Sequence, residues 1–157
     1  MNPEVKVYIE SMDGMRRSIR RALEGVDAKE LNWNPLPGEA NSLYAIVSHL
    51  CTSETGMLHQ RITGQATTGG EPHNAFEDRG DDPVELLGRM DEVGNTTRRL
   101  MEGLTAEDLD RSIGSGGNRP SRTLREWISM YVRHQSLHLG HIEITKQFYE
   151  KGVGTGR

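Results

Sequence analysis

One helical pattern runs without interruption through residues 123–152, TLREWISMYVRHQSLHLGHIEITKQFYEKG. The segment begins with Thr123 and Glu126, the residue types of a capping box that satisfies the free amides of a first helical turn. Apolar, aromatic and histidine side chains then follow one face at helical spacing: Trp127, Ile128, Tyr131, His138, Ile142 and Tyr149. The pattern ends at Gly152, a residue type that favours helix termination. These features predict one long amphipathic helix.

Three earlier segments carry the same signals of a helix start, an apolar face and a helix end. They span residues 2–25, 41–64 and 82–103, and each ends at a glycine. Two of them begin with a capping residue followed by proline, and the segment 41–64 begins with Asn41 and Ser42. Apolar residues repeat at three- and four-residue steps in all three. The predicted fold class is therefore all-α, a four-helix bundle.

The connection between the second and third predicted helices is long, polar and rich in glycine. Residues 71–82 show no apolar periodicity and exceed the length that a tight turn between antiparallel helices needs. We expect this segment to cross over along the bundle, which makes the second and third helices parallel and gives an up-down-down-up order. The alternative is a surface excursion between antiparallel helices.

Two similar short stretches precede the second and fourth long helices. They are LEGVDAKEL at residues 23–31 and MEGLTAEDL at residues 101–109. Each is followed by a loop that contains proline or glycine, so we expect each to form a short helical turn that covers one end of the bundle. A single echo of this kind does not indicate a repeat protein.

Composition favours a single helical domain. The chain has 157 residues, enough to bury one core without disulfides, and we place one domain at residues 1–152 with a flexible C-terminal tail at 153–157. Aromatic residues make up only 5 % and there are 7 methionines, which suits adaptable aliphatic packing between helices. Cys51 is the only cysteine, which excludes an internal disulfide or a multi-cysteine zinc site. We expect it to fill the core.

Charge and hydropathy exclude two classes of partner. A formal net charge of -4 argues against a nucleic-acid surface, which needs concentrated positive charge. No apolar run approaches the roughly 20 residues of a membrane span, and the first residues lack the apolar region of a secretion signal. We expect a cytoplasmic protein whose partners are small molecules or other proteins. We also expect a homodimer, since the apolar stripes of the first and third helices need not fit wholly inside one bundle.

The last predicted helix carries the most informative polar residues. Side chains four positions apart on a helix lie within roughly 40° of each other, so His134 and His138 share a face. His141 falls on the same side, and this side coincides with the edge of the apolar stripe. Two imidazoles one turn apart can bind one metal ion. The alternative is a set of half-buried histidines satisfied by neighbouring side chains.

Two histidines do not complete a metal site, and the third ligand has several candidates. His134, His138 and His141 together would span about 10.5 Å of helix axis, which is too long for one ion. A ligand from another helix gives better geometry. The helical period favours Glu54, which falls within the apolar stripe of the second helix, over His49, which lies roughly 120° from its centre. His59 and His73 are expected to face solvent or lie in loops.

A cluster of four arginines lies on the first predicted helix, at Arg16, Arg17, Arg20 and Arg21. Such a cluster can hold carboxylates of a substrate. The simpler interpretation is a solvated helix face whose charges pair along the helix, and we adopt it.

Two sequence stretches resemble the DinB-like superfamily of metal-binding four-helix bundles. The first is Trp33-Asn34-Pro35 followed by the segment 42–54, which resembles the family's W-x-P loop and its H-L-x-x-x-E pattern. The second is His134-x-x-x-His138-x-Gly140-His141, which resembles the family's H-x-x-x-H-x-G-Q signature. The order of these motifs, the helix count and the chain length agree with the family over nearly the whole chain.

The resemblance implies a metal site formed by His49, His134 and His138. It implies one divalent ion, zinc or nickel first and iron or manganese as alternatives. His49 occupies the family's third ligand position, so the resemblance reverses the preference for Glu54. His141 departs from the family pattern, which commonly has glutamine there. This residue is therefore an additional contact of the site or an alternative ligand, as Glu54 is.

The resemblance also implies a class of reaction. Relatives include S-transferases and isomerases that use low-molecular-weight thiols such as bacillithiol or mycothiol. A metal-dependent transferase that joins a small thiol to an electrophile is therefore the first functional hypothesis. A metal-dependent hydrolase is the competing chemistry, and a non-catalytic, metal-stabilised stress or interaction module is the alternative from another class.

Overall fold

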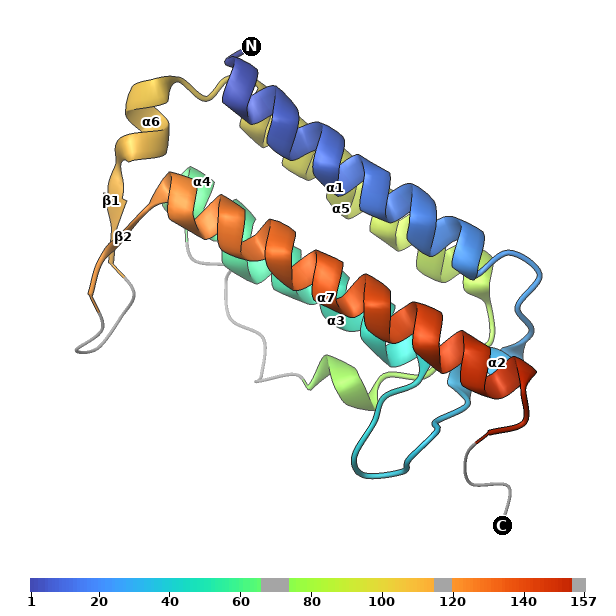
Figure 1. Ribbon diagram of the computed structural model, residues 1–157. Helices are drawn as coiled ribbons and strands as arrows, with labels where there is room; N and C mark the ends of the chain where they lie inside the picture. The colour runs from blue at the N-terminus through green and yellow to red at the C-terminus, as the bar shows by residue number, and fades with distance from the viewer. Residues whose placement is uncertain (66–73, 115–119, 154–157) are drawn as a thin grey trace.

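Four long helices form the body of the protein in the computed structural model, which describes residues 1–65, 74–114 and 120–153 (Figure 1). They are α1 (Pro3–Ala22), α3 (Leu43–Glu54), α5 (Pro83–Glu102) and α7 (Leu124–Glu150). Helix α3 continues through a π-helical segment, η1 (Thr55–His59), into α4 (Gln60–Thr63). This all-α four-helix bundle confirms the predicted fold class.

The helix starts follow from the predicted capping residues. The Asn2 side chain accepts a hydrogen bond from the amide of Glu4, and that of Asp82 accepts from two amides of the first turn of α5. Thr123 and Glu126 form the predicted capping box. Gly64, with φ of 73°, ends the second helical segment in the left-handed conformation that glycine adopts without strain.

Side-chain contacts define the helix directions. Helices α1 and α7 are parallel because their contacts advance together along both: Tyr8–Ser129, Met15–Ser136 and Ala22–Lys146. Helices α1 and α5 are antiparallel, with ion pairs Asp13–Arg98 and Arg20–Asp91. Helices α3 and α5 run in the same direction (Figure 1). The order is up-down-down-up, as predicted, with the crossover between α3 and α5.

Short elements cover the ends of the bundle. Helix α2 (Ala28–Asn32) and helix α6 (Ala106–Asp110) form from the two echoing stretches and bury Leu31 and Leu109 respectively. A 3-10 turn, η2 (Ala75–Glu77), lies in the crossover. A two-residue hairpin of β1 (Ser112–Ile113) and β2 (Arg122–Thr123) precedes α7, and the sequence analysis did not predict it. Residues 154–157 of the predicted tail lie outside the described residues.

The apolar core consists of two clusters with a polar layer between them. One cluster surrounds Leu31, Leu43 and Ile142, and the other surrounds Met12, Leu109 and Ile128. Between them, Arg16, Glu54 and Thr97 are buried on three different helices. Cys51 fills the first cluster as predicted, and burial raises the pKa of its thiol to about 11. Within the described chain, none of the helices combines the length and apolarity that crossing a bilayer requires.

Candidate metal centre

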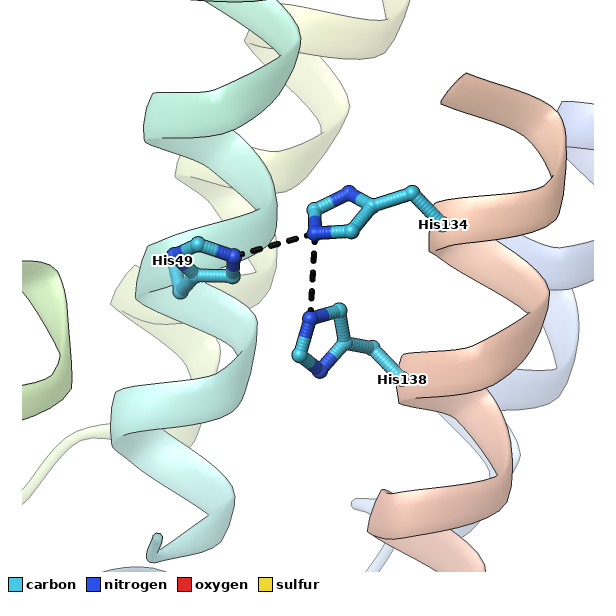
Figure 2. Close-up of side chains that lie close together, drawn as sticks. All are labelled: His49, His134 and His138. Carbon is cyan, nitrogen blue, oxygen red and sulfur yellow. Dashed lines mark hydrogen bonds between the residues drawn. The ribbon is translucent and has the colours of Figure 1, made fainter. Parts of the chain in front are cut away.

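Helices α3 and α7 bring three imidazole rings together (Figure 2). His134 and His138 lie one turn apart on α7, and His49 faces them from α3. The Nε2 atom of His134 lies 3.1 Å from Nε2 of His49 and 3.1 Å from Nε2 of His138. One nitrogen from each ring lies within 4.8 Å of the others, and no fourth His, Cys, Asp or Glu of the described residues belongs to the group.

The spacing of these nitrogen atoms fits the ligands of a first-row metal ion. Zinc binds imidazole nitrogen at about 2.0–2.1 Å in tetrahedral sites, which places neighbouring ligand atoms about 3.3 Å apart. The two Nε2 separations of 3.1 Å are close to this value. Imidazole also suits nickel, iron and copper, so the donor set fits a transition metal without selecting one.

Hydrogen bonds between the rings satisfy the three facing nitrogens only in part. The Nε2 atom of a neutral imidazole carries either one proton or one lone pair, so Nε2 of His134 must share it between Nε2 of His49 and Nε2 of His138. Nε2 of His49 also lies 3.2 Å from the hydroxyl of Ser53. A cation held by the three rings needs no such sharing because it accepts a separate lone pair from each ring. The residues present therefore fit a metal ion.

Burial favours the neutral form of these histidines, which is the form that binds metals. Desolvation, with a smaller effect from His134, lowers the pKa of His49 to about 4. Desolvation, with smaller effects from the neighbouring histidines, also lowers the pKa of His138 to about 4. Desolvation lowers the pKa of His134 as well. All three rings can therefore offer a lone pair at neutral pH.

The outward nitrogen atoms of the α7 histidines have different surroundings. Nδ1 of His138 lies 3.4 Å from Nδ1 of His141, which is exposed and stands outside the three-histidine group. Nδ1 of His134 is buried and has no hydrogen-bond partner among the described residues. His141 therefore contacts a candidate ligand from behind instead of joining the cluster.

The crossover segment closes one side of the histidine cluster. Phe76 of η2 stacks on the ring of His49, with centroids 4.0 Å apart and planes inclined by 21°. The hydroxyl of Ser48 donates a hydrogen bond to Asp78, which ties the same segment to α3. Phe76 thus restricts the ring of His49 and shields one of its faces from water. Sequence analysis missed this residue, although it is the only Phe, Trp or Tyr within residues 66–82.

Glu54 belongs to a different polar group, at the centre of the bundle. Its carboxylate accepts hydrogen bonds from Arg16, Thr97 and Tyr131, the last at 2.8 Å. Residues five apart on a helix differ by roughly 140° in direction. Glu54 therefore points to the bundle centre, where side chains of α1 and α5 meet it, whereas His49 points to the candidate ligands of α7. The structure brings His49, and not Glu54, beside His134 and His138.

Two expectations about exposed residues are wrong. Arg16 is only 8 % exposed and pairs with Asp13 at 3.0 Å and with Glu54, while the other three arginines of its cluster are exposed. His59 is half-buried, with Nε2 2.7 Å from Thr97 Oγ1. The wider turn of η1 changes the direction of His59, and a uniform helical period cannot anticipate that. His73 lies outside the described residues.

Comparison with known proteins identifies the family of this chain. A family model of the DinB superfamily matches residues 11–142, which is most of the chain. The chain belongs to the DinB superfamily. The long crossover between parallel α3 and α5 is thus a feature of a DinB superfamily member. The same holds for the positions of His49, His134 and His138. Among curated proteins, the comparison found no match.

Solved structures of similar fold support the DinB architecture. YfiT from Bacillus subtilis is 19 % identical to this chain and has a TM-score of 0.74. The match covers 96 % of this chain and 90 % of YfiT. YfiT is described as a probable metal-dependent hydrolase with an unusual four-helix bundle topology. A conserved protein from Enterococcus faecalis is 16 % identical, with a TM-score of 0.73 over 94 % and 96 %. The DinB-like protein YjoA from Bacillus subtilis is 18 % identical, with a TM-score of 0.68 over 91 % and 92 %. At these identities the likeness concerns the fold.

Proposed function

We propose that this DinB superfamily member is a metal-dependent enzyme that holds one divalent ion with His49, His134 and His138. The convergence of three Nε2 atoms from two helices is the observation that carries the proposal. A purely structural role would be better served by partners that satisfy each nitrogen separately, as Thr97 does for His59. Zinc and nickel are the first candidates for the ion, with iron and manganese next.

The reaction we propose is the transfer of a small thiol to an electrophile. An ion held by three neutral imidazoles keeps its positive charge, and such a cation lowers the pKa of a thiol or water that it binds. In the reaction, the thiol proton passes to solvent and the sulfur electron pair forms a bond to an electrophilic carbon. The leaving group departs with the electrons of its own bond to that carbon. Low-molecular-weight thiols are the proposed co-substrates.

The chain's own residues would orient the ligands and exclude water from part of the site. Phe76 stacks on His49 and covers one ring face. His138 is fixed by α7 and by its contact with His141. Because the described residues add no fourth side chain to the cluster, three protein ligands leave room for a thiol or a water molecule.

Hydrolysis is the second candidate function. It is favoured by YfiT, whose fold is similar and which is described as a probable metal-dependent hydrolase. The same three histidines would serve both reactions, because a metal ion can activate water or a thiol. The two candidates differ in the nucleophile and therefore in the substrates that the protein consumes.

A paired assay tests the two reactions. The purified protein is stripped with a chelator, reloaded separately with zinc, nickel, iron or manganese, and supplied with cysteine or bacillithiol and benzyl chloride. We expect thiol consumption and chloride release in equal amounts, dependent on metal and absent from His134→Ala. Hydrolysis of 4-nitrophenyl acetate without thiol would favour the second candidate. A loaded protein that binds metal tightly and accelerates neither reaction would favour a non-catalytic module.

A further inference from the structure

A preformed apolar pocket of about 230 Å³ lies between the loop that follows α2 and the C-terminal half of α7. Leu36 of the loop and Ile144 and Phe148 of α7 line it, and Ile46 of α3 contributes to the wall. These first three side chains are 51 %, 42 % and 36 % exposed. Among the described residues, three of the eight large exposed apolar side chains therefore line this one pocket.

Hydrogen bonds and an aromatic contact hold the loop wall in place. The Asn34 side chain donates to the carbonyl of Ala40 at 2.6 Å and accepts from the amide of Leu36 at 3.0 Å. The ring of Trp33 meets the ring of Tyr149 edge-on, with centroids 5.5 Å apart. The loop is thus fastened both to itself and to α7. A wall fixed in this way lowers the entropic cost of ligand binding.

One residue of the pocket also contacts the candidate metal centre. His141 lines the pocket, and its Nδ1 lies 3.4 Å from Nδ1 of His138. The pocket and the three-histidine cluster therefore share a boundary on α7. A molecule that fills the pocket therefore lies next to the residue that contacts His138.

The charge of the lining limits the class of ligand. Among the described residues that line the pocket, Glu39 is the only Asp or Glu and none is Lys or Arg. An anionic ligand would meet the Glu39 carboxylate without a Lys or Arg to pair with, whereas a neutral or cationic ligand would not be repelled by that carboxylate. The volume is below the roughly 300–1,000 Å³ of pockets for drug-sized ligands, which suits a body of one or two rings.

We propose that this pocket binds the apolar, uncharged or cationic body of a small organic substrate that reacts at the histidine cluster. The substrate part of this inference rests on the proposed function, whereas binding in the pocket does not. The chain's last residues, Gly-Thr-Gly-Arg at 154–157, have no large apolar side chain and do not match the lining.

Three probes of equal size and different charge test the binding: 1-naphthylmethanol, 1-naphthylmethylamine and 1-naphthoate. Amide chemical shifts of the full chain are followed by NMR during titration. We expect shifts centred on Ala40, Ile46 and Ile144 for the alcohol and the amine, and binding of the naphthoate at least about ten-fold weaker. Equal binding of all three would overturn the charge argument, and shifts elsewhere would overturn the site.

Matched variants test the location. Ile144→Trp fills the pocket and should abolish the probe shifts, whereas Leu137→Trp, at a 57 % exposed position on the same helix outside the lining, should leave them unchanged. Glu39→Gln should remove the preference for the amine over the alcohol. If the pocket signals shift with protein concentration without a probe, the surface is a contact between two copies and the proposal fails.

Activity and metal content separate this inference from the proposed function. With 1-(chloromethyl)naphthalene as electrophile, Ile144→Trp should keep its metal but lose at least about ten-fold in kcat/KM. His49→Ala should lose its metal and still bind the alcohol probe. Loss of probe binding without loss of turnover would overturn the substrate assignment. Full metal content in His49→Ala would overturn the proposed ligand set and leave the pocket standing.

Discussion

The polar layer at the bundle centre and the histidine cluster both use side chains of α3 and α7, but the layer also includes side chains of α1 and α5, and its polar groups are matched in a different way. In the layer, opposite charges and matched donors meet: Glu54 accepts from Arg16, Thr97 and Tyr131. Burial and Glu54 raise the pKa of Tyr131 well above its usual value, so its hydroxyl stays a donor. In the histidine cluster, three equal nitrogens face one another without such matching.

This difference separates a structural network from a ligand site. A buried ion pair with complementary donors is complete within the protein, and removing one partner leaves an uncompensated charge. A set of converging lone-pair donors can bind an added cation. The layer should therefore control stability, and the cluster should control metal binding. The predictions below test that division.

The largest effect is expected from Glu54→Ala. The substitution leaves Arg16 buried without its main partner and should lower the free energy of unfolding by about 3–5 kcal/mol. Urea unfolding of the metal-free protein measures it. Glu54→Gln, which keeps one acceptor oxygen and the side-chain volume, should cost less. The folded fraction of Glu54→Ala should still bind metal, and an emptied site in that fraction would show that the two clusters do not divide the roles.

The next effect concerns the three candidate ligands. His49→Ala, His134→Ala and His138→Ala should each weaken metal binding by more than the roughly 10- to 100-fold change typical of residues that only support a ligand. Metal content after identical loading and dialysis, followed by competition titration, measures the loss. His59→Ala is the control, because it removes a histidine of the other polar group. If His49→Ala stays fully occupied while Glu54→Ala or His141→Ala is empty, the ligand set is wrong.

Much of the fold could be predicted from local signals. Capping residues such as Asn2, Asp82 and Thr123 act within one helical turn, so their effect is visible in the sequence. The length of residues 71–82 favoured the crossover over a surface excursion between antiparallel helices. The β1–β2 hairpin was missed because each strand has two residues, too few for a periodic pattern. The π-helical turn at Thr55–His59 has no comparable local signal, and it caused the wrong expectation for His59.

The candidate site shows where helical periodicity stops being sufficient. His134 and His138 could be paired from their spacing alone, because one turn of one helix fixes their relation. The choice between His49 and Glu54 depended on which neighbouring helix each face of α3 meets, which is a tertiary property. The resemblance to the DinB-like superfamily supplied His49. Phe76 lies in the crossover, whose path over α3 cannot be read from composition.

A smaller loss of stability is expected from Gly94→Ala. A Cβ atom at Gly94 of α5 would lie 2.6 Å from Nε and 2.9 Å from Cζ of Arg16. Arg16 cannot move away cheaply, because it is buried and paired with Glu54. Overpacking of this kind typically costs about 1–3 kcal/mol, measured by urea unfolding.

Gly88 of the same helix provides the matched control for Gly94. A Cβ atom there would meet nothing within 4 Å. Gly88→Ala should therefore stabilise the helix by about 0.5–1 kcal/mol. If both variants gain stability equally, the polar layer is less tightly packed around Arg16 than its contacts indicate.

His141→Ala should have an intermediate effect on metal affinity. The variant removes the neighbour of His138 Nδ1 but leaves all three converging Nε2 atoms. The expected loss is about 10- to 100-fold, as for other residues that orient a ligand. His141→Gln, which restores the family's usual residue and a side chain able to hydrogen bond, should recover part of it. An empty site in His141→Ala would make His141 a ligand in its own right.

The smallest effect is a pH dependence of the metal-free protein. The pKa of His49 and of His138 is lowered to about 4 in the folded state, whereas an unfolded histidine titrates near 6.5. Between these values the unfolded chain binds more protons, so stability should fall as pH drops from about 7 toward 4. Thermal unfolding in chelator at several pH values measures the slope. His49→Gln and His138→Gln remove one titrating group each and should flatten the curve of stability against pH, whereas Gln60→Ala should not.

Saturating zinc should raise the melting temperature most at neutral pH, where the imidazoles bind it, and progressively less as protons compete. A wild-type curve as flat as that of the His49→Gln/His138→Gln double variant would show that these rings do not lose solvation on folding, and the cluster would then lack the burial that distinguishes it from a surface group.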